Sequence, residues 1–293
     1  MSLKNGYVRV LLFILPYFFV VGGFQLIAYE VLDINVTASF EDFKNEISSL
    51  QNLIISFFGL IGTVLITLFF RIKLDEKSFY SLGFQFKNTG KDILLGLGLG
   101  LLPMLLFFLL FLSIESIEII EFNFIGLELF LVGLLFISVS FSEEILFRGY
   151  VLNNFMDSSN KYIALIISSL LFALMHGLNP NITTIGMFNL FLAGIMLGIC
   201  YLFTQNLWFA FANHFSWNFF QAMFGFHVSG LTIYTPIKLK IESSIWTGGE
   251  FGIEGSVLTI LLQIIIIVLL YFKYKEASPY GIAPRKNQTK KLQ

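Results

Sequence analysis

Eight apolar segments, each close to twenty residues long, dominate this sequence of 293 residues. A helix needs about 20 mostly apolar residues to cross the hydrocarbon core of a bilayer, so each segment is a candidate membrane span. The predicted spans are 8–29, 50–70, 92–113, 125–152, 162–178, 184–204, 206–226 and 255–273. We therefore expect an all-α, polytopic bundle of transmembrane helices that forms a single membrane domain over residues 1–293.

Charged residues are too scarce to coat a soluble domain. They make up 13% of the chain, whereas soluble proteins carry roughly 25%. The net charge of −1 provides no basic surface for nucleic acid. The single cysteine, Cys200, excludes an intramolecular disulfide and a cysteine-based zinc cluster, and we expect it to pack as a small apolar residue. The sequence predicts an integral membrane protein, in contact with membrane lipid, and the frequent Phe, Ile, Asn and Lys residues favour a bacterial cell membrane.

Basic residues gather in three regions that lie on one side of an eight-span bundle. Lys and Arg stay on the cytoplasmic side of membrane proteins. The basic residues of these regions are Lys4, Arg9, Arg71, Lys73, Lys77, Lys87, Lys91, Lys273, Lys275, Arg285, Lys286, Lys290 and Lys291. The connections expected on the opposite side are acidic over 30–46 and 115–121, and mixed over 227–254. We predict that both termini are cytoplasmic and that the tail, 277–293, is flexible and basic.

The predicted span 125–152 contains three ionisable residues, Glu143, Glu144 and Arg148. Charges inside a bilayer are costly, and they usually face the interior of the bundle and mark function. Glu144 and Arg148 are four residues apart and share a helix face, so we expect them to pair. Glu143 lies about 100° away around the helix and stays free for acid–base chemistry. The alternative is a self-neutralising packing device, but two acids and one base leave a surplus negative charge that packing does not require.

Two further polar groups interrupt the later spans. His176 follows Phe172 by four residues near the end of the fifth span, where a histidine commonly serves only as a cap. His214 and Asn218 are also four residues apart and project from one helix face, as interhelical hydrogen-bonding residues do as well. A rise of 1.5 Å per residue puts His214 at the depth of Glu143, whereas His176 needs a short or tilted helix to reach it. The other polar residues of this region are expected at the interface or the surface: Asn179, Asn181, Asn189 and His227.

Taken together, these groups read E-E-x-x-x-R, F-x-x-x-H and H-x-x-x-N on successive spans. This order resembles the CPBP family of intramembrane proteases, also called the type II CAAX prenyl endopeptidase or Abi family. The matching residues are Glu143, Glu144, Arg148, Phe172, His176, His214 and Asn218. The resemblance covers 125–226, the expected catalytic core, and implies an eight-helix bundle around a conical cavity. It also implies a hydrolase that cuts a peptide bond of a membrane-associated peptide or protein, either lipidated or bacteriocin-like.

Two mechanisms can be built from these side chains. In a metal-free mechanism, Glu143 and His176 activate a water molecule, while His214 and Asn218 stabilise the oxyanion. Supporting positions are assigned to Glu144, Arg148 and Phe172. In a metalloprotease mechanism, Glu143, His176 and His214 would ligate a single divalent metal, zinc. The H-E-x-x-H helix of many zinc proteases is absent, so no metal ligand is assigned and the metal-free mechanism is favoured.

Two other functions fit parts of the pattern. A non-catalytic, peptide-binding immunity or regulatory membrane protein can use the same bundle, although a pure binder does not require both histidines and a free acid. A proton-coupled transporter also carries Glu and His within its spans. The sequence has no internal repeat of the kind found in many transporters.

Overall fold

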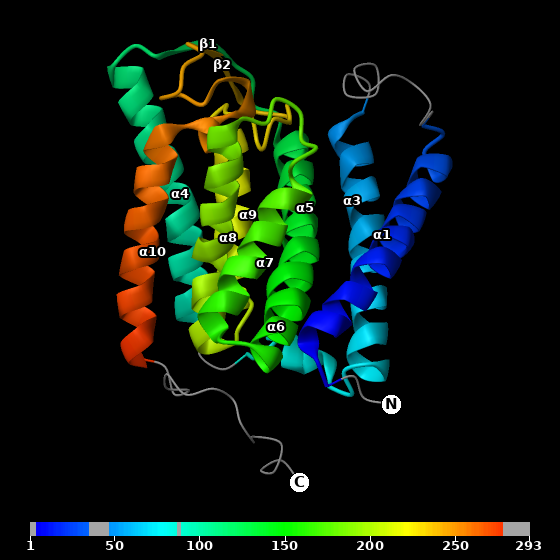
Figure 1. Ribbon diagram of the computed structural model, residues 1–293. Helices are drawn as coiled ribbons and strands as arrows, with labels where there is room; N and C mark the ends of the chain where they lie inside the picture. The colour runs from blue at the N-terminus through cyan, green and yellow to red at the C-terminus, as the bar shows by residue number, and fades with distance from the viewer. Residues whose placement is uncertain (1–3, 35–46, 87–88, 278–293) are drawn as a thin grey trace.

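The computed structural model describes residues 4–34, 47–86 and 89–277, and its helices run side by side in one bundle (Figure 1). The long helices are α1 (Gly6–Val31), α3 (Ser49–Lys73), α4 (Thr89–Ser113), α5 (Gly126–Glu144), α7 (Lys161–Met175), α8 (Thr184–Thr204), α9 (Trp208–Met223) and α10 (Val257–Ala277). Each predicted segment coincides with one of these helices. In the described part of the chain, six helices are long and apolar enough to cross a membrane. The chain is therefore an integral membrane protein, while eight complete spans stay a prediction because α7 and α9 have only 15 and 16 residues.

Polar residues at the borders of the apolar segments fix where several helices begin. Asn5, Asn160 and Thr183 each accept a hydrogen bond from a backbone N–H in the first turn of the helix that follows. Ser48 and Gln51 form a reciprocal capping box at the start of α3. These contacts satisfy N–H groups that have no partner within the helix. Local sequence therefore defines these helix starts.

The fourth span continues beyond its predicted end at residue 152. A π-helical stretch, Ile145–Leu152, follows α5 and leads directly into α6 (Asn153–Ser158). Glu143 thus lies 15 residues before the end of α6, and His176 lies 15 residues after the start of α7. Because a short turn joins α6 to α7, the side chains of Glu143 and His176 lie at the same depth in the bundle. α7 also crosses the bundle obliquely (Figure 1), and the expected difference in depth between these two residues disappears.

Two glycines let α4 approach α9 closely. A Cβ atom at Gly100 would lie 1.9 Å from Ser216 Oγ, and one at Gly96 would lie 2.7 Å from the carbonyl oxygen of Phe209. The two glycines are four residues apart and form a small-residue face of the kind that brings membrane helices together. Ser216 Oγ also donates a hydrogen bond to the Gly96 carbonyl at 3.1 Å. This contact fixes the helix that carries His214 and Asn218.

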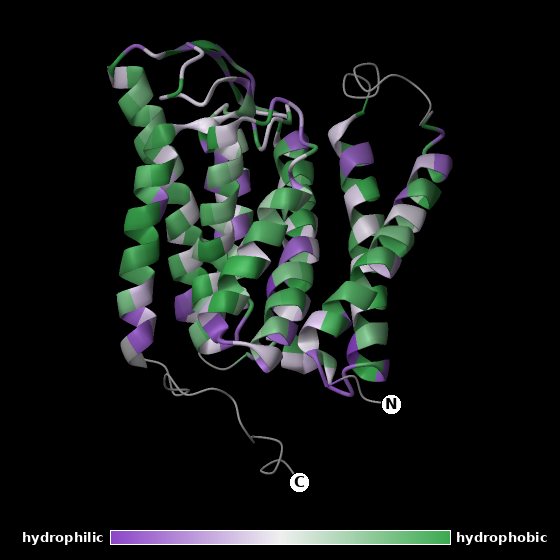
Figure 2. Cartoon of the chain, viewed as in Figure 1, coloured by the Kyte–Doolittle hydropathy of each residue, from purple (hydrophilic) through white to green (hydrophobic). Residues whose placement is uncertain are grey.

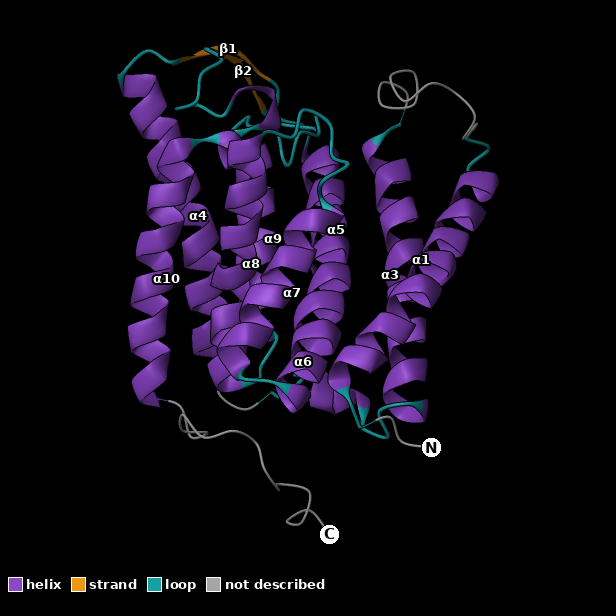
Figure 3. Cartoon of the chain, in the orientation of Figure 1, coloured by secondary structure: helices purple, strands orange, loops and turns teal. Residues whose placement is uncertain are grey.

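A two-stranded antiparallel sheet covers one end of the bundle, here called the sheet end (Figure 3). β1 (Ile117–Phe122) pairs with β2 (Ile237–Ile241), with Ile117 opposite Ile241 and a bulge between Ile119 and Glu121. The sequence analysis assigned only loops to both regions, because each strand is short and its partner is distant along the chain. The sheet brings together the connections on either side of the α5–α9 region.

At the opposite end, here called the terminal end, α1 begins and α10 finishes (Figure 1). Hydrophilic residues gather at this end and in the connections at the sheet end, while the helix bodies between them are mainly hydrophobic (Figure 2). The shared location agrees with termini on one side of the membrane, and the cytoplasmic assignment stays a prediction. Cys200 is fully buried, as expected. Of the predicted tail 277–293, only Ala277 belongs to the described residues.

Candidate active site

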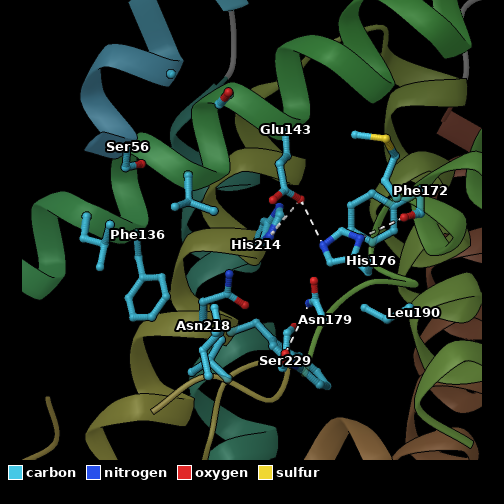
Figure 4. A pocket seen from close by; sticks show the side chains of 18 of the residues that line it. Ser56, Phe136, Glu143, Phe172, His176, Asn179, Leu190, His214, Asn218 and Ser229 are labelled. Atoms are coloured by element: carbon cyan, nitrogen blue, oxygen red, sulfur yellow. Dashed lines mark hydrogen bonds and ion pairs between the residues drawn. The ribbon is translucent and has the colours of Figure 1, made fainter. Parts of the chain in front are cut away.

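A cavity of about 540 Å³ lies between α1 and α3 on one side and α5, α7, α8 and α9 on the other. The residues with predicted catalytic roles all line it: Glu143, His176, His214 and Asn218. Glu143 comes from the end of α5, His176 caps the C-terminus of α7, and the remaining two lie one turn apart on α9. Figure 4 shows the two imidazoles beside the Glu143 carboxylate, with Asn218 across the hollow. The structure therefore brings these four residues together, while their roles in catalysis stay predictions.

Glu144 turns away from the cavity and forms the predicted ion pair with Arg148. Its Oε1 lies 2.7 Å from Arg148 Nη1, and both side chains are about 1% exposed. Arg148 Nη2 also donates to the carbonyl of Gly194 at 3.2 Å. The same Glu144 oxygen accepts a hydrogen bond from His214 Nδ1 at 2.8 Å. Pairing with Arg148 confirms the local prediction, whereas the link to His214, 70 positions along the chain, was not predicted.

Hydrogen bonds to acceptor oxygens define how both imidazoles are oriented. His176 Nδ1 lies 2.8 Å from the carbonyl oxygen of Phe172, and His214 Nδ1 faces the Glu144 carboxylate. Since a carbonyl or carboxylate can only accept, each Nδ1 carries a proton. In the neutral ring the other nitrogen, Nε2, then holds a lone pair. Both Nε2 atoms point toward Glu143.

Glu143 Oε2 is buried and has no hydrogen-bond partner among the described residues. It lies 3.6 Å from His176 Nε2 and 3.9 Å from His214 Nε2. In their neutral forms the two imidazoles thus present acceptor nitrogens beside this carboxylate oxygen, to which no described residue donates. A water molecule donates two hydrogen bonds and can satisfy two of these acceptors. The arrangement suits a bound water held for proton abstraction.

Phe172 separates Arg148 from the two histidines. The Arg148 guanidinium lies 4.6 Å from the centre of the Phe172 ring, a distance typical of a cation–π contact. The same ring lies 4.7 Å from the His176 ring and 6.2 Å from the His214 ring. Phe172 therefore packs against three of the residues of the site and excludes water from the Glu144–Arg148 pair.

The cavity also contains polar residues that the sequence analysis did not assign to it. Tyr17 and Ser142 line it and are joined through Thr63, with oxygen–oxygen distances of 3.2 and 2.8 Å. This chain of hydroxyls ties α1 and α3 to α5 beside Glu143. No sequence pattern points to it, because single hydroxyl residues are common in membrane helices.

Glu254, from the segment before α10, is a second acid in the cavity lining. It is 7% exposed, and its Oε2 accepts hydrogen bonds from the backbone N–H and the hydroxyl of Ser229 and from Gln221 Nε2. Burial raises the pKa of the Glu254 carboxyl, while the bonds from Ser229 and Gln221 and the nearby His176 lower it in part. The sequence analysis treated Glu254 as one charge of a mixed loop.

Two of the asparagines expected at the interface lie inside the protein. Asn179 lines the cavity and donates to the Ser229 carbonyl at 3.2 Å. Asn189 is 1% exposed and donates to two carbonyls of the segment before α10. Asn181 is exposed, as expected, and His227 is half-buried, with its Nδ1 donating to the Glu250 carbonyl. The expectation did not include the buried position of Asn189 or the cavity-lining position of the half-buried Asn179, because it ignored the loops that fold over the ends of α7 and α8, and an interfacial depth for both stays a prediction.

The chemistry of a zinc site is present only in part. Both histidines direct Nε2 toward Glu143, and each Nδ1 is held by an acceptor, as in many metal-binding histidines. In the described ranges, however, no group of three or more His, Cys, Asp or Glu side chains is placed to hold a metal ion. The described residues therefore do not form a metal site in this arrangement, and the choice between the metal-free and the zinc mechanism stays untested.

One region of the chain matches the model of a known protein family. Residues 125–220, about a third of the chain, match the family model described as type II CAAX prenyl endopeptidase Rce1-like. The matched region contains the seven residues of the three sequence motifs. No curated protein matches the chain.

Proposed function

We propose that this chain is an intramembrane protease that hydrolyses a peptide bond by a metal-free, glutamate-based mechanism, because residues 125–220 match the family model described as type II CAAX prenyl endopeptidase Rce1-like. The observation that carries the proposal is the unpartnered Oε2 of Glu143 facing two imidazole nitrogens. The substrate class is a membrane-associated peptide, lipidated or bacteriocin-like, which enters the cavity from the bilayer.

In the proposed reaction, Glu143 and His176 hold one water molecule. As the water oxygen bonds to the scissile carbonyl carbon, Glu143 takes a proton from the water and the carbonyl oxygen becomes negative. When the C–N bond breaks, the same proton passes from Glu143 to the leaving nitrogen. The products are a carboxylic acid and an amine, so one water is consumed for each bond.

His214 and Asn218 stabilise the negative oxygen of the intermediate. The Asn218 amide donates directly. His214 donates from Nε2 as an imidazolium, a form that Glu144 stabilises by accepting the Nδ1 hydrogen bond. Arg148 holds Glu144 in place through the ion pair. Glu144 and Arg148 are thus positioning residues, which act through His214.

The test compares peptides released by cells that contain the wild-type protein or Glu143→Gln, grown in water enriched in ¹⁸O. We expect certain peptides with ¹⁸O in a new C-terminal carboxyl from the cells with the wild type, and the same peptides to be missing from the cells with the variant. The matched control is Glu128→Gln, an acid on the same helix that does not line the cavity. Equal release from wild type and Glu143→Gln contradicts the proposed base. If the purified wild-type protein holds one zinc ion per molecule, and removal of the zinc also removes the activity, the metal-free mechanism is contradicted.

A further inference from the structure

The segment before α10 is built to present Glu254 to the cavity. Gly252 has φ 88°, and a Cβ atom there would lie 2.0 Å from the His227 carbonyl oxygen, so this tight turn requires glycine. Asn189 Nδ2 donates to the carbonyls of Glu254 and Ser256, at 2.7 and 2.8 Å. The backbone around Glu254 is therefore fixed from both sides.

The two oxygens of Glu254 have different surroundings. Oε2 accepts all three hydrogen bonds, from the Ser229 N–H at 2.6 Å, the Ser229 hydroxyl at 2.9 Å and Gln221 Nε2 at 3.3 Å. Oε1 receives none from the described residues, and the side chain lines the cavity. Burial raises the pKa of the Glu254 carboxyl, its hydrogen bonds offset this in part, and a cation brought to the free oxygen favours the ionised form further. One oxygen of a held carboxylate is thus available to a ligand.

The charge of the cavity is unbalanced. Among the described residues that line it, none is Lys or Arg and two are acids, Glu143 and Glu254, so the acids outnumber the cations even when His214 is an imidazolium. The nearest guanidinium, that of Arg148, is already bound by Glu144. Charges in a poorly solvated cavity interact strongly. A cationic group entering the cavity is attracted, and an anionic one is repelled.

Glu254 and Glu143 occupy different parts of this cavity. In Figure 4 Ser229, which holds the Glu254 carboxylate, lies beyond Asn179 and away from Glu143. Glu254 is therefore held on the Ser229 side of the cavity, whereas the proposed water-binding site lies beside Glu143. A peptide with its scissile bond at Glu143 can place a neighbouring side chain at Glu254.

We propose that Glu254 binds a cationic side chain of the substrate, Lys or Arg, near the scissile bond, so that the enzyme selects basic peptides. This inference rests on the proposed function and names the substrate class of the same cavity. A carboxylate paired with a desolvated cation forms a charge-assisted hydrogen bond, which a neutral side chain of similar length cannot replace. Glu254 is a specificity residue here and takes no part in the proton transfers.

Binding to the Glu143→Gln protein tests the proposal without requiring hydrolysis. The probes are fluorescent apolar peptides in which one Lys is moved residue by residue, each paired with a peptide that carries Nε-acetyl-lysine at that place. At one position we expect the Lys peptide to bind about tenfold more tightly, the size of one charge-assisted hydrogen bond. Equal binding of both peptides at every position overturns the proposal, whatever the variants of Glu254 do.

A second arm assigns the preference to Glu254. Glu254→Gln, added to Glu143→Gln, keeps an acceptor oxygen for Ser229 and removes the charge, so we expect the preference for Lys to fall to about twofold or less. The control is Glu250→Gln, a neighbouring acid whose side chain is 71% exposed and lies outside the cavity lining. A preference that survives Glu254→Gln overturns the assignment. Failure of the wild type to cleave any of the peptides that bind contradicts only the proposed function.

Discussion

A cluster of charged residues lies at the terminal end of the bundle. Both of its acids pair with cations, whereas Glu143 in the cavity has no hydrogen-bond partner among the described residues. This cluster, here called the ion-pair cluster, consists of Arg9, Arg71, Asp75, Lys77 and Asp157. Asp75 lies 3.0 Å from Arg71 and 3.6 Å from Arg9, and its side chain is 0% exposed. Asn154 donates to the same carboxylate at 3.1 Å. Both acids of the cluster are therefore paired, and its three cations outnumber them.

In the cavity region only some of the charged residues are paired. Glu144 and Arg148 neutralise each other, much as the cluster does, but they leave Glu143 and two Nε2 atoms facing one empty volume. Buried groups with unmet hydrogen-bonding capacity cost stability, and they persist where function needs them. Paired charges therefore indicate a structural role in this bundle, whereas Glu143 combines an unmet acceptor with a place in the cavity lining beside two imidazoles, which indicates a chemical one.

The largest effect on stability is expected at Asp75. Asp75→Asn removes the carboxylate that pairs with Arg71 and one of the two that pair with Arg9, and breaking such a buried pair costs about 3–5 kcal/mol. Denaturation in detergent micelles measures the loss, with the adjacent exposed acid changed by Glu76→Gln as the control. Cleavage per folded molecule should stay at the wild-type level. Unchanged stability in Asp75→Asn would mean that the cluster does not hold the bundle together.

Glu144 forms a buried ion pair with Arg148, and it also accepts the hydrogen bond that orients His214. Its replacement should therefore affect both the stability of the protein and its catalytic activity. Glu144→Gln keeps an acceptor near Arg148 and His214 but removes the charge, at a cost of roughly 1–3 kcal/mol. Turnover should fall roughly tenfold to a hundredfold, comparable to the loss of a carboxylate that orients a histidine. Because Glu144 does not touch the substrate, kcat should fall while KM stays nearly constant. A rise in KM with unchanged kcat would place Glu144 in substrate binding instead.

The smallest effect is expected at the surface of the sheet end. Glu118 and Lys240 face each other across β1 and β2 at 3.5 Å, with side chains that are 71% and 73% exposed. Solvent screens such a pair, so Glu118→Gln should change stability by less than about 1 kcal/mol. The same detergent denaturation measures it. A loss as large as that of Asp75→Asn would mean that pairing, and not burial, sets the cost.

The helices and the local pairs could be predicted from sequence, because both depend on residues close along the chain. The lengths of the apolar segments predicted the helices, and the spacing of four residues predicted the Glu144–Arg148 pair. The contact between His214 and Glu144, the sheet and the turn that presents Glu254 all join distant segments. They depend on packing such as the close approach of α4 to α9 at Gly100, which no single segment encodes. The family pattern located the motifs, and it gave no signal for Glu254.

The most direct measurement is made on one preparation of purified Glu143→Gln, by thermal unfolding in detergent followed by cleavage of a substrate peptide that the wild type cuts. Glu143 Oε2 has no hydrogen-bond partner among the described residues that the substitution could remove. We therefore expect a free energy of unfolding within about 1 kcal/mol of the wild type, or a more stable protein. We also expect no detectable cleavage. Cleavage at the wild-type rate, or a loss of stability as large as that of Asp75→Asn, would contradict the assignment of Glu143 as an unpaired acid that activates water.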